Sequence, residues 1–216
     1  MRPGRLTLLV FLTVLVSGCT RTVRVSWTPQ PLAVTLEPNA FRAYEASLRA
    51  PVGIASLDLI PSADLRPLVS VVPQTVANVE ADTSRRIRLG ILLPPTVRPG
   101  QRITGHLSGL EIVVDVNPPT AGGALESLRT ALDEGNDAAY LAQFAPARVA
   151  EARRTLATFT DTARLALSQT LQTAERIAVD GDTAEYRVTL LLHGQRVESS
   201  IVLQRSPDGI WRVIRF

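Results

Sequence analysis

The chain has 216 residues, of which 45% are hydrophobic and 20% are charged, a balance typical of folded proteins that argues against intrinsic disorder. Its 23 basic residues are all arginine, which excludes Schiff-base chemistry and a P-loop lysine. They stand against 20 acidic residues, so the net charge of +3 gives no basic excess of the kind that nucleic-acid binding requires.

The N-terminal segment has the order of a secretory signal peptide. Two arginines precede an apolar run over residues 6–16, and the small residues Ser17 and Gly18 follow. The run is shorter than the roughly 20 apolar residues that a membrane-spanning helix needs. The pattern therefore predicts a signal peptide over residues 1–18, cleaved between Gly18 and Cys19.

Val16-Ser17-Gly18-Cys19 resembles the lipobox of bacterial lipoproteins. In that family the cysteine sulfur carries diacylglycerol, and the amine freed by cleavage is acylated with a fatty acid such as palmitate. Cys19 is the only cysteine in the chain and stands where the lipobox requires it. The resemblance implies lipid attachment at Cys19, and more than one acyl chain is needed for a stable anchor. The alternative is an ordinary cleaved signal followed by a chance cysteine.

The residue after the cysteine implies a location. Thr20 stands where aspartate would mark retention in the inner membrane, so the resemblance implies a cell-envelope lipoprotein of the outer membrane that faces the periplasm. Residues 19–24 would form the lipidated N-terminus and tether. Because lipid would occupy Cys19, no disulfide could form, and core packing alone would hold the folded domains.

From residue 25 to residue 116, short strand-like runs alternate with turns. Prolines punctuate the runs, which suits sheet edges and turns, and the regular spacing predicts an antiparallel all-β sandwich. The run at 41–48 has an ambiguous period and is also compatible with a short helix. The expected strands cover residues 23–27, 32–36, 41–48, 56–60, 68–72, 76–81, 86–93, 102–107 and 111–116.

The segment from Pro94 to Gly100, followed by Arg102 to Leu107, resembles the last hairpin of bacterial immunoglobulin-like domains. In those domains a Pro-Gly turn precedes a strand and a final valine-rich strand. The resemblance implies an immunoglobulin-like sandwich, although the cysteine–tryptophan core of antibody domains is missing. Trp27 is expected to be a core or edge aromatic residue.

Residues 117–123 combine two prolines with two glycines and predict a linker. After it, residues 124–216 read as helices followed by strands, the order of an α+β domain. Leu125, Leu128 and Leu132 fall on one face of the first helix. Further helices are expected to begin at Asp137, Pro146 and Asp161. Strands are expected around 177–179, 184–192, 197–204 and 210–216.

The second domain resembles the nuclear-transport-factor-2-like superfamily, in which helices pack on a curved antiparallel sheet to form a cone. The residues that carry the resemblance are Asp133 to Ala139 with Phe144-Ala145-Pro146, and the terminal strand from Asp208 to Phe216. The expected fold class is therefore two domains, an all-β immunoglobulin-like sandwich and an α+β cone. The resemblance is barely specific for function.

Some members of that superfamily, such as ketosteroid isomerases, use a tyrosine and carboxylates inside the cone. The residues of the right types are Tyr140, Asp161, Tyr186 and Glu198. Asp161 is expected at a helix N-cap, Glu198 on a solvent-facing strand position, and both tyrosines at core rims. The sequence therefore predicts no catalytic residue.

Cofactor and metal sites are not expected either. Asp180-Gly181-Asp182 lacks the ligand series of a calcium loop and predicts a turn. Nothing near His106 completes a metal set. The residues of a Ser-His-Asp triad can come from anywhere in a chain, but no motif around His106 or His193 supports one.

These observations favour a non-catalytic, membrane-tethered binding or assembly module of the cell envelope. Its partners would be the membrane, through the N-terminal lipid, and either an envelope protein or a small apolar ligand. The arginine clusters at 85–88 and 153–154 lack interleaved aromatics and are expected on solvated faces, so nucleic acid is not expected. The alternative is a carrier of a small hydrophobic ligand, or an isomerase-like enzyme, that uses the interior of the cone.

Overall fold

The computed structural model describes residues 10–16, 19–192 and 195–216, with side chains from 25 to 190 and from 195 to 216. The chain divides into two compact units. The first contains the chain up to Thr35, 43–91 and 101–115, and the second contains 36–42, 92–100 and 116–216. Of the predicted features, the start of the signal peptide, the Gly18 side of the cleavage site, the Cys19 side chain and His193 lie outside the described residues.

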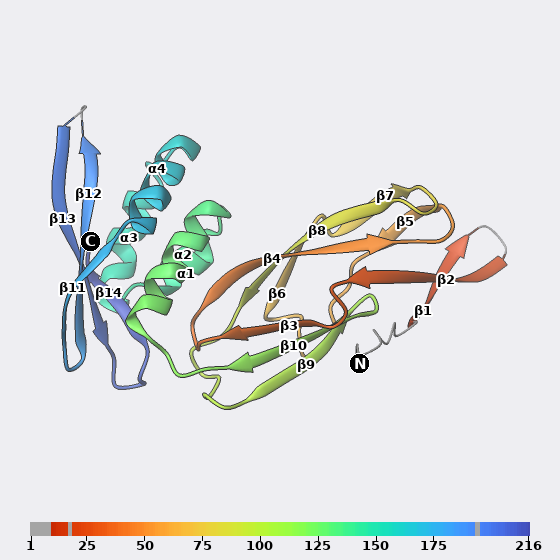
Figure 1. Cartoon of the computed structure of the whole chain (residues 1–216), viewed down its shortest axis with the longest axis horizontal. Helices are drawn as coiled ribbons and strands as arrows, with labels where there is room; N and C mark the ends of the chain where they lie inside the picture. The colour runs from red at the N-terminus through yellow and green to blue at the C-terminus, as the bar shows by residue number, and fades with distance from the viewer. Residues whose placement is uncertain (1–9, 17–18, 193–194) are drawn as a thin grey trace, which may run out of the picture. The chain divides into compact units, whose positions relative to one another are not determined.

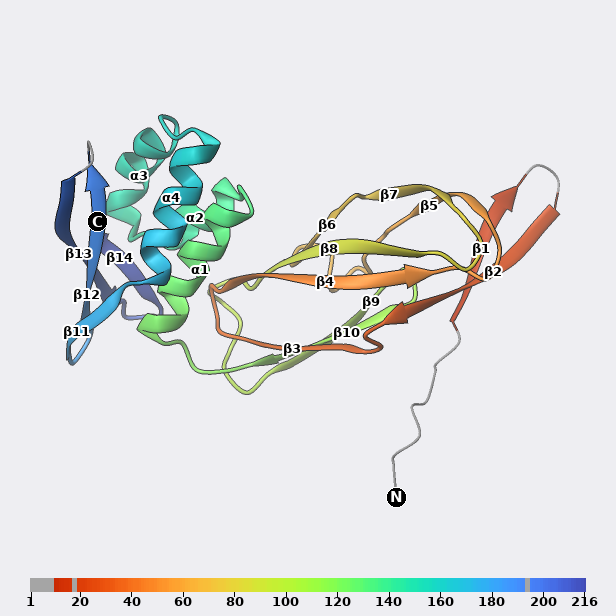
Figure 2. The same cartoon turned by 45° about the horizontal axis from the view of Figure 1, so that its top comes forward.

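The first unit is built from antiparallel β-sheets (Figure 1). Figures 1 and 2 show the three-stranded sheet as a layer separate from β4 and β8 of the five-stranded sheet. The five-stranded sheet has the order β1 (Val10–Val16), β2 (Cys19–Thr28), β4 (Phe41–Arg49), β8 (Ser84–Leu92), β6 (Val69–Val72). The smaller sheets have the orders β3 (Leu32–Leu36), β10 (Leu110–Val116), β9 (Arg102–Leu107), and β5 (Ile54–Asp58), β7 (Thr75–Val79).

Alternation of buried and exposed side chains explains these strands, because successive residues of a strand point to opposite faces of the sheet. Along β3 every second residue is buried, and β10 repeats the pattern with half-buried residues between. The ambiguous run at 41–48 is strand β4, so the helix alternative is wrong. Trp27 is 6% exposed, and its Nε1 donates to the Ser108 carbonyl at 3.2 Å, so it is a core aromatic.

The second unit is an α+β arrangement of helices followed by a four-stranded antiparallel sheet with its strands in chain order. The helices cover one face of the sheet (Figures 1 and 2). The helices are α1 (Ala121–Asp133), α2 (Asp137–Ala142), the 3₁₀ turn η1 (Pro146–Arg148), α3 (Val149–Leu156) and α4 (Asp161–Gln172). The strands are β11 (Glu175–Asp180), β12 (Thr183–Leu192), β13 (Gln195–Arg205) and β14 (Trp211–Arg215).

Helix α1 begins at Ala121, three residues earlier than the sequence predicts, and takes up the two glycines of the expected linker. Thr120 caps it, its side chain accepting from the Gly123 backbone N–H. A Cβ on Gly123 would collide with the Glu37 carboxylate, which itself accepts from the Thr120 N–H and hydroxyl at 2.8 Å each. Gly123 is therefore needed for close packing rather than for a loose linker.

Segments from the region that the sequence assigns to the sandwich complete the second unit. Asn39 donates to the Ala142 carbonyl at 2.9 Å, and Gln143 Nε2 donates to the Asn39 carbonyl at 2.9 Å. Phe41 is buried in the same core cluster as the predicted leucine face of α1. The core of this unit therefore draws on residues 36–42 in addition to those from 116 onward.

Candidate functional site

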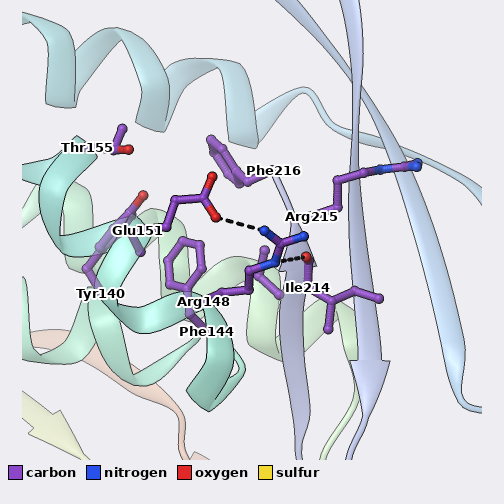
Figure 3. A pocket seen from close by; sticks show the side chains of 10 residues that line it. Tyr140, Phe144, Arg148, Glu151, Thr155, Ile214, Arg215 and Phe216 are labelled. Atoms are coloured by element: carbon purple, nitrogen blue, oxygen red, sulfur yellow. Dashed lines mark hydrogen bonds and ion pairs between the residues drawn. The ribbon is translucent and has the colours of Figure 1, made fainter.

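The second unit contains a pocket with a volume of about 220 Å³ (Figure 3). Its walls come from α2 and the loop after it, from η1 and α3, and from residues 213–216. The lining residues are Tyr140, Phe144, Arg148, Glu151, Ala152, Thr155, Val213, Ile214, Arg215 and Phe216.

Local capping and backbone bonds fix these walls. Asn136 caps α2, its side chain accepting from the Ala139 N–H, and Pro146 begins the turn that leads into α3. The loop between α2 and η1 is tied to β14 on both sides of Phe144: the Val213 N–H donates to the Gln143 carbonyl at 2.8 Å, and the Ala145 N–H donates to the Val213 carbonyl at 3.0 Å. The pocket is thus built on elements that are bonded to one another.

Three aromatic rings form the apolar side of the pocket. The Tyr140 and Phe144 ring centroids are 5.0 Å apart, and those of Phe144 and Phe216 are 6.3 Å apart, both pairs in tilted geometry. Tilted pairs at such distances place a ring edge near a ring face, which is favourable. Phe216 is 46% exposed, so one ring of the series reaches solvent.

The Tyr140 hydroxyl is the polar group of greatest interest in the pocket. The side chain is 2% exposed, and no hydrogen bond of this hydroxyl is found among the described residues. Burial raises the pKa of Tyr140 to about 12, and the positive charge of Arg164 offsets only part of the rise. The hydroxyl therefore keeps its proton at neutral pH and is available as a donor. Buried tyrosine hydroxyls usually find a partner, which makes this group a candidate ligand contact.

The charged residues of the pocket are already engaged. Arg148 donates through Nε to the Ile214 carbonyl at 2.9 Å and through a terminal nitrogen to Glu151 at 2.8 Å (Figure 3). Arg215 points away from the other labelled side chains in Figure 3 and donates to Glu185 at 3.1 Å and to Ser200 at 2.9 Å. The pocket therefore holds a neutralised ion pair rather than a free cation.

This arrangement suits binding better than proton transfer. A general base or acid works best with a pKa near the operating pH. The pKa of Tyr140, about 12, is far above neutral pH, and the Glu151 carboxylate is paired with Arg148. The apolar walls, the Tyr140 and Thr155 hydroxyls and one ion pair can hold and orient a small molecule.

Of the four residues that the sequence singled out for cone chemistry, only Tyr140 lines the pocket. Asp161 is the exposed first residue of α4, where Thr160 provides the cap, and Glu198 is exposed on β13. Tyr186 is buried on β12, where burial raises its pKa, but it does not line the pocket. These side chains do not form one catalytic set.

Sequence reasoning missed Arg148, Glu151 and Phe216. Their spacing gives a partial signal, because Arg148 and Glu151 are three residues apart and helical neighbours at that spacing can pair. No local sequence pattern predicts that Arg148 and Glu151 lie beside Phe216, which is more than 60 residues further along the chain.

Within the described ranges, no group of three or more histidine, cysteine, aspartate or glutamate side chains is placed to hold a metal ion. His106 is exposed on β9. In the same part of the chain, no helix has the length and apolar character to cross a bilayer.

A hollow with a volume of about 420 Å³ in the first unit is a weaker candidate. It lies beside β6 and the end of β5, and the polar residues that line it are exposed to water. Asp58 there already accepts from the Thr75 hydroxyl at 2.8 Å. Such groups give a ligand little advantage over solvent.

Comparison with known proteins adds no family to these observations. A scan against protein-family models and a search of curated proteins both found no match.

Proposed function

We propose that the protein is a lipid-anchored, non-catalytic binding module of the cell envelope, in which the second unit takes a small, mostly apolar ligand. Cys19 would carry the lipid, at the outer membrane and facing the periplasm. In this proposal the first unit is an immunoglobulin-like sandwich, and the second belongs to the nuclear-transport-factor-2-like folds with a cone-shaped interior.

The observation that carries the ligand proposal is the Tyr140 hydroxyl, which opens onto the pocket from a largely buried ring and has no hydrogen-bond partner among the described residues. A ligand that offers an oxygen acceptor to this donor would take the place of solvent in the pocket. The three aromatic rings would cover its apolar part. The ion pair of Arg148 and Glu151 disfavours a ligand with a net charge, because neither partner is free to neutralise it.

The size of the pocket narrows the ligand further. Small-molecule pockets commonly measure roughly 300–1,000 Å³, and this one is smaller, at about 220 Å³. A compact ring compound with one carbonyl or hydroxyl oxygen fits these limits better than a long acyl chain does.

Strand pairing supports the anchor proposal. Residues 19–25 pair with β1 alone, whereas Ser26 to Thr28 pair with β4. Cleavage before Cys19 would remove β1 and leave residues 19–25 without a partner strand. Val25 is buried, so the tether would be residues 19–24, and six extended residues span roughly 20 Å at about 3.4 Å each, which is enough for a tether between a bilayer and a folded domain.

The anchor is tested by acylation. In cells fed radiolabelled palmitate, the wild-type chain should incorporate label and Cys19→Ser should not, because the thiol is the attachment nucleophile. Label that persists in Cys19→Ser, or its absence from the wild type, would contradict the anchor.

The pocket is tested with Prodan, a neutral naphthyl ketone whose fluorescence reports an apolar environment. Tyr140→Phe should weaken binding about three- to tenfold, since a single hydrogen bond contributes about 1 kcal/mol. Tyr186→Phe is the matched control, because that tyrosine is also buried but lies outside the pocket. Equal affinities in all three proteins would rule out Tyr140 as the ligand donor.

A further inference from the structure

The end of the first unit from which the tether leaves has features that the ligand pocket does not explain. Ser26 pairs with Arg49, so Arg49 lies directly beside the point where residues 19–25 leave the sheet. The turn after Arg49 is exposed, and Val52 at its tip is 46% exposed. An apolar side chain thus projects from the tethered end.

The start of β8 lies at this same end. The Asp82 N–H, just before β8, donates to the Ala50 carbonyl at 2.8 Å, and Arg49 pairs with the Asp82 carboxylate at 3.1 Å. The first residues of β8 include two exposed arginines, Arg85 and Arg86. Arg88 lies further along the strand, where it pairs with Glu45 at 3.9 Å.

Charge is unevenly distributed within the first unit. The tethered end holds five arginines against two carboxylates, counting those of the tether: Arg21, Arg24, Arg49, Arg85 and Arg86 against Glu80 and Asp82. The remainder of the mature first unit has the opposite balance, with three arginines against five carboxylates: Arg66, Arg88 and Arg102 against Glu45, Asp58, Asp64, Glu111 and Asp115. An anionic surface would attract the tethered end and repel the rest.

We propose that this basic end, defined as Arg49, Val52, Arg85 and Arg86, contacts the anionic phospholipid headgroups of the bilayer that holds the lipid anchor. The proposal rests on the proposed anchor, which brings this end within reach of the membrane. Arginines near an anionic surface each contribute about 1 kcal/mol, and a lipid anchor gains from a second, basic signal. The contact would hold the first unit against the membrane instead of letting it swing on its tether.

The test uses the mature chain from Thr20 to Phe216, which lacks the only cysteine and so binds without acylation. Co-sedimentation with vesicles of phosphatidylethanolamine and phosphatidylglycerol is measured at low ionic strength. The double variant Arg85→Gln, Arg86→Gln should lower the vesicle partition coefficient about thirtyfold, because each arginine contributes about 1 kcal/mol. Added salt should weaken wild-type binding, because exposed charges are screened.

A matched control removes exposed arginines from the other unit. Arg153→Gln with Arg154→Gln on α3 should change vesicle binding by less than about twofold. Wild-type strength of binding in the Arg85→Gln, Arg86→Gln variant, or an equal loss in the α3 control, would overturn the proposal. Equal wild-type binding to pure phosphatidylcholine vesicles would overturn it as well.

A single-cysteine readout reports which end touches the bilayer. Val52→Cys carrying the environment-sensitive NBD fluorophore should brighten and shift to the blue on addition of anionic vesicles, whereas Thr104→Cys, exposed on β9, should not. The same response at both positions would contradict a defined contact. Because acylation is absent here, failure of this test is separate from failure of the palmitate test.

Discussion

The two units differ in what their interiors contain. Among the described residues, every buried polar side chain belongs to the second unit, and the buried side chains of the first are apolar. The buried polar residues are Asn39, Ser127, Thr130, Gln143 and Ser168. Apolar packing is non-directional, whereas hydrogen bonds fix distances and angles.

One of these buried polar residues, Gln143, connects the core to the walls of the pocket. Gln143 bonds to the Asn39 carbonyl through its side chain and accepts from Val213 through its own carbonyl. Its chain neighbour Phe144 and its partner Val213 both line the pocket. Most of the buried polar side chains therefore belong to the unit that contains the pocket, whereas in the first unit the buried Trp27 donates to the Ser108 carbonyl.

The largest expected effect is the same in both units. Leu128→Ala and Leu89→Ala each truncate a fully buried leucine, in the second and first unit respectively, and each should cost about 3 kcal/mol of unfolding free energy. Trp27 reports the first unit and Trp211 the second, so urea unfolding followed by fluorescence of single-tryptophan variants separates them. A loss below about 1 kcal/mol in either unit would contradict the packing described.

The next effect is specific to the second unit. Gln143→Leu should cost about 2 kcal/mol, because the Asn39 carbonyl loses its partner in a buried site, and it should also weaken Prodan binding. Gln169→Leu, exposed on α4, is the control and should stay within about 0.5 kcal/mol of the wild type. Equal stabilities for the two variants would remove the proposed difference between the cores.

A third prediction concerns alkaline pH. The unfolded hydroxyl of Tyr140 has a pKa near 10 and the folded one a pKa of about 12, so between these values the unfolded chain loses its proton first. Stability should therefore fall by about 2 kcal/mol as pH rises through this window. Urea unfolding of Tyr140→Phe should show a smaller fall, and a fall as steep as that of the wild type would assign the effect elsewhere.

The smallest effect tests Gly123. Alanine would gain up to about 1 kcal/mol of helix propensity but would collide with Glu37 at a cost of about 1–3 kcal/mol, so Gly123→Ala should destabilise by about 1 kcal/mol. In a Glu37→Ala background the same substitution should instead stabilise. A double-mutant cycle by thermal unfolding measures this, and the same sign in both backgrounds would refute the collision.

Local patterns predicted the parts of the fold that depend on local spacing. Strands 32–36 and 102–107 agree with β3 and β9 residue for residue, and the leucine face of α1 is buried as expected. Strands have a side-chain period of 2 residues and helices one of 3.6, and both periods can be recognised from positions that are close in the sequence. The start of α1 was misplaced because two glycines resemble a linker when the distant Glu37 is not considered.

Much of the candidate site is formed by contacts between residues that are far apart in the sequence. Tyr140 was named from its residue type, but the Asn39 and Gln143 bonds join residues more than 100 positions apart and leave no periodic trace. Phe216 likewise reaches Phe144 only through the fold. The residues that form the wall of the pocket could therefore not be predicted from local sequence spacing.

The ligand claim is tested most directly by native mass spectrometry of the mature protein extracted gently from its own cell envelope. The account predicts the mass of the lipidated chain plus a small additional mass that leaves on denaturation. The fraction of protein that carries this additional mass should be lower in Tyr140→Phe. The lipidated chain alone, or an added mass unaffected by Tyr140→Phe, would contradict a ligand held by this pocket.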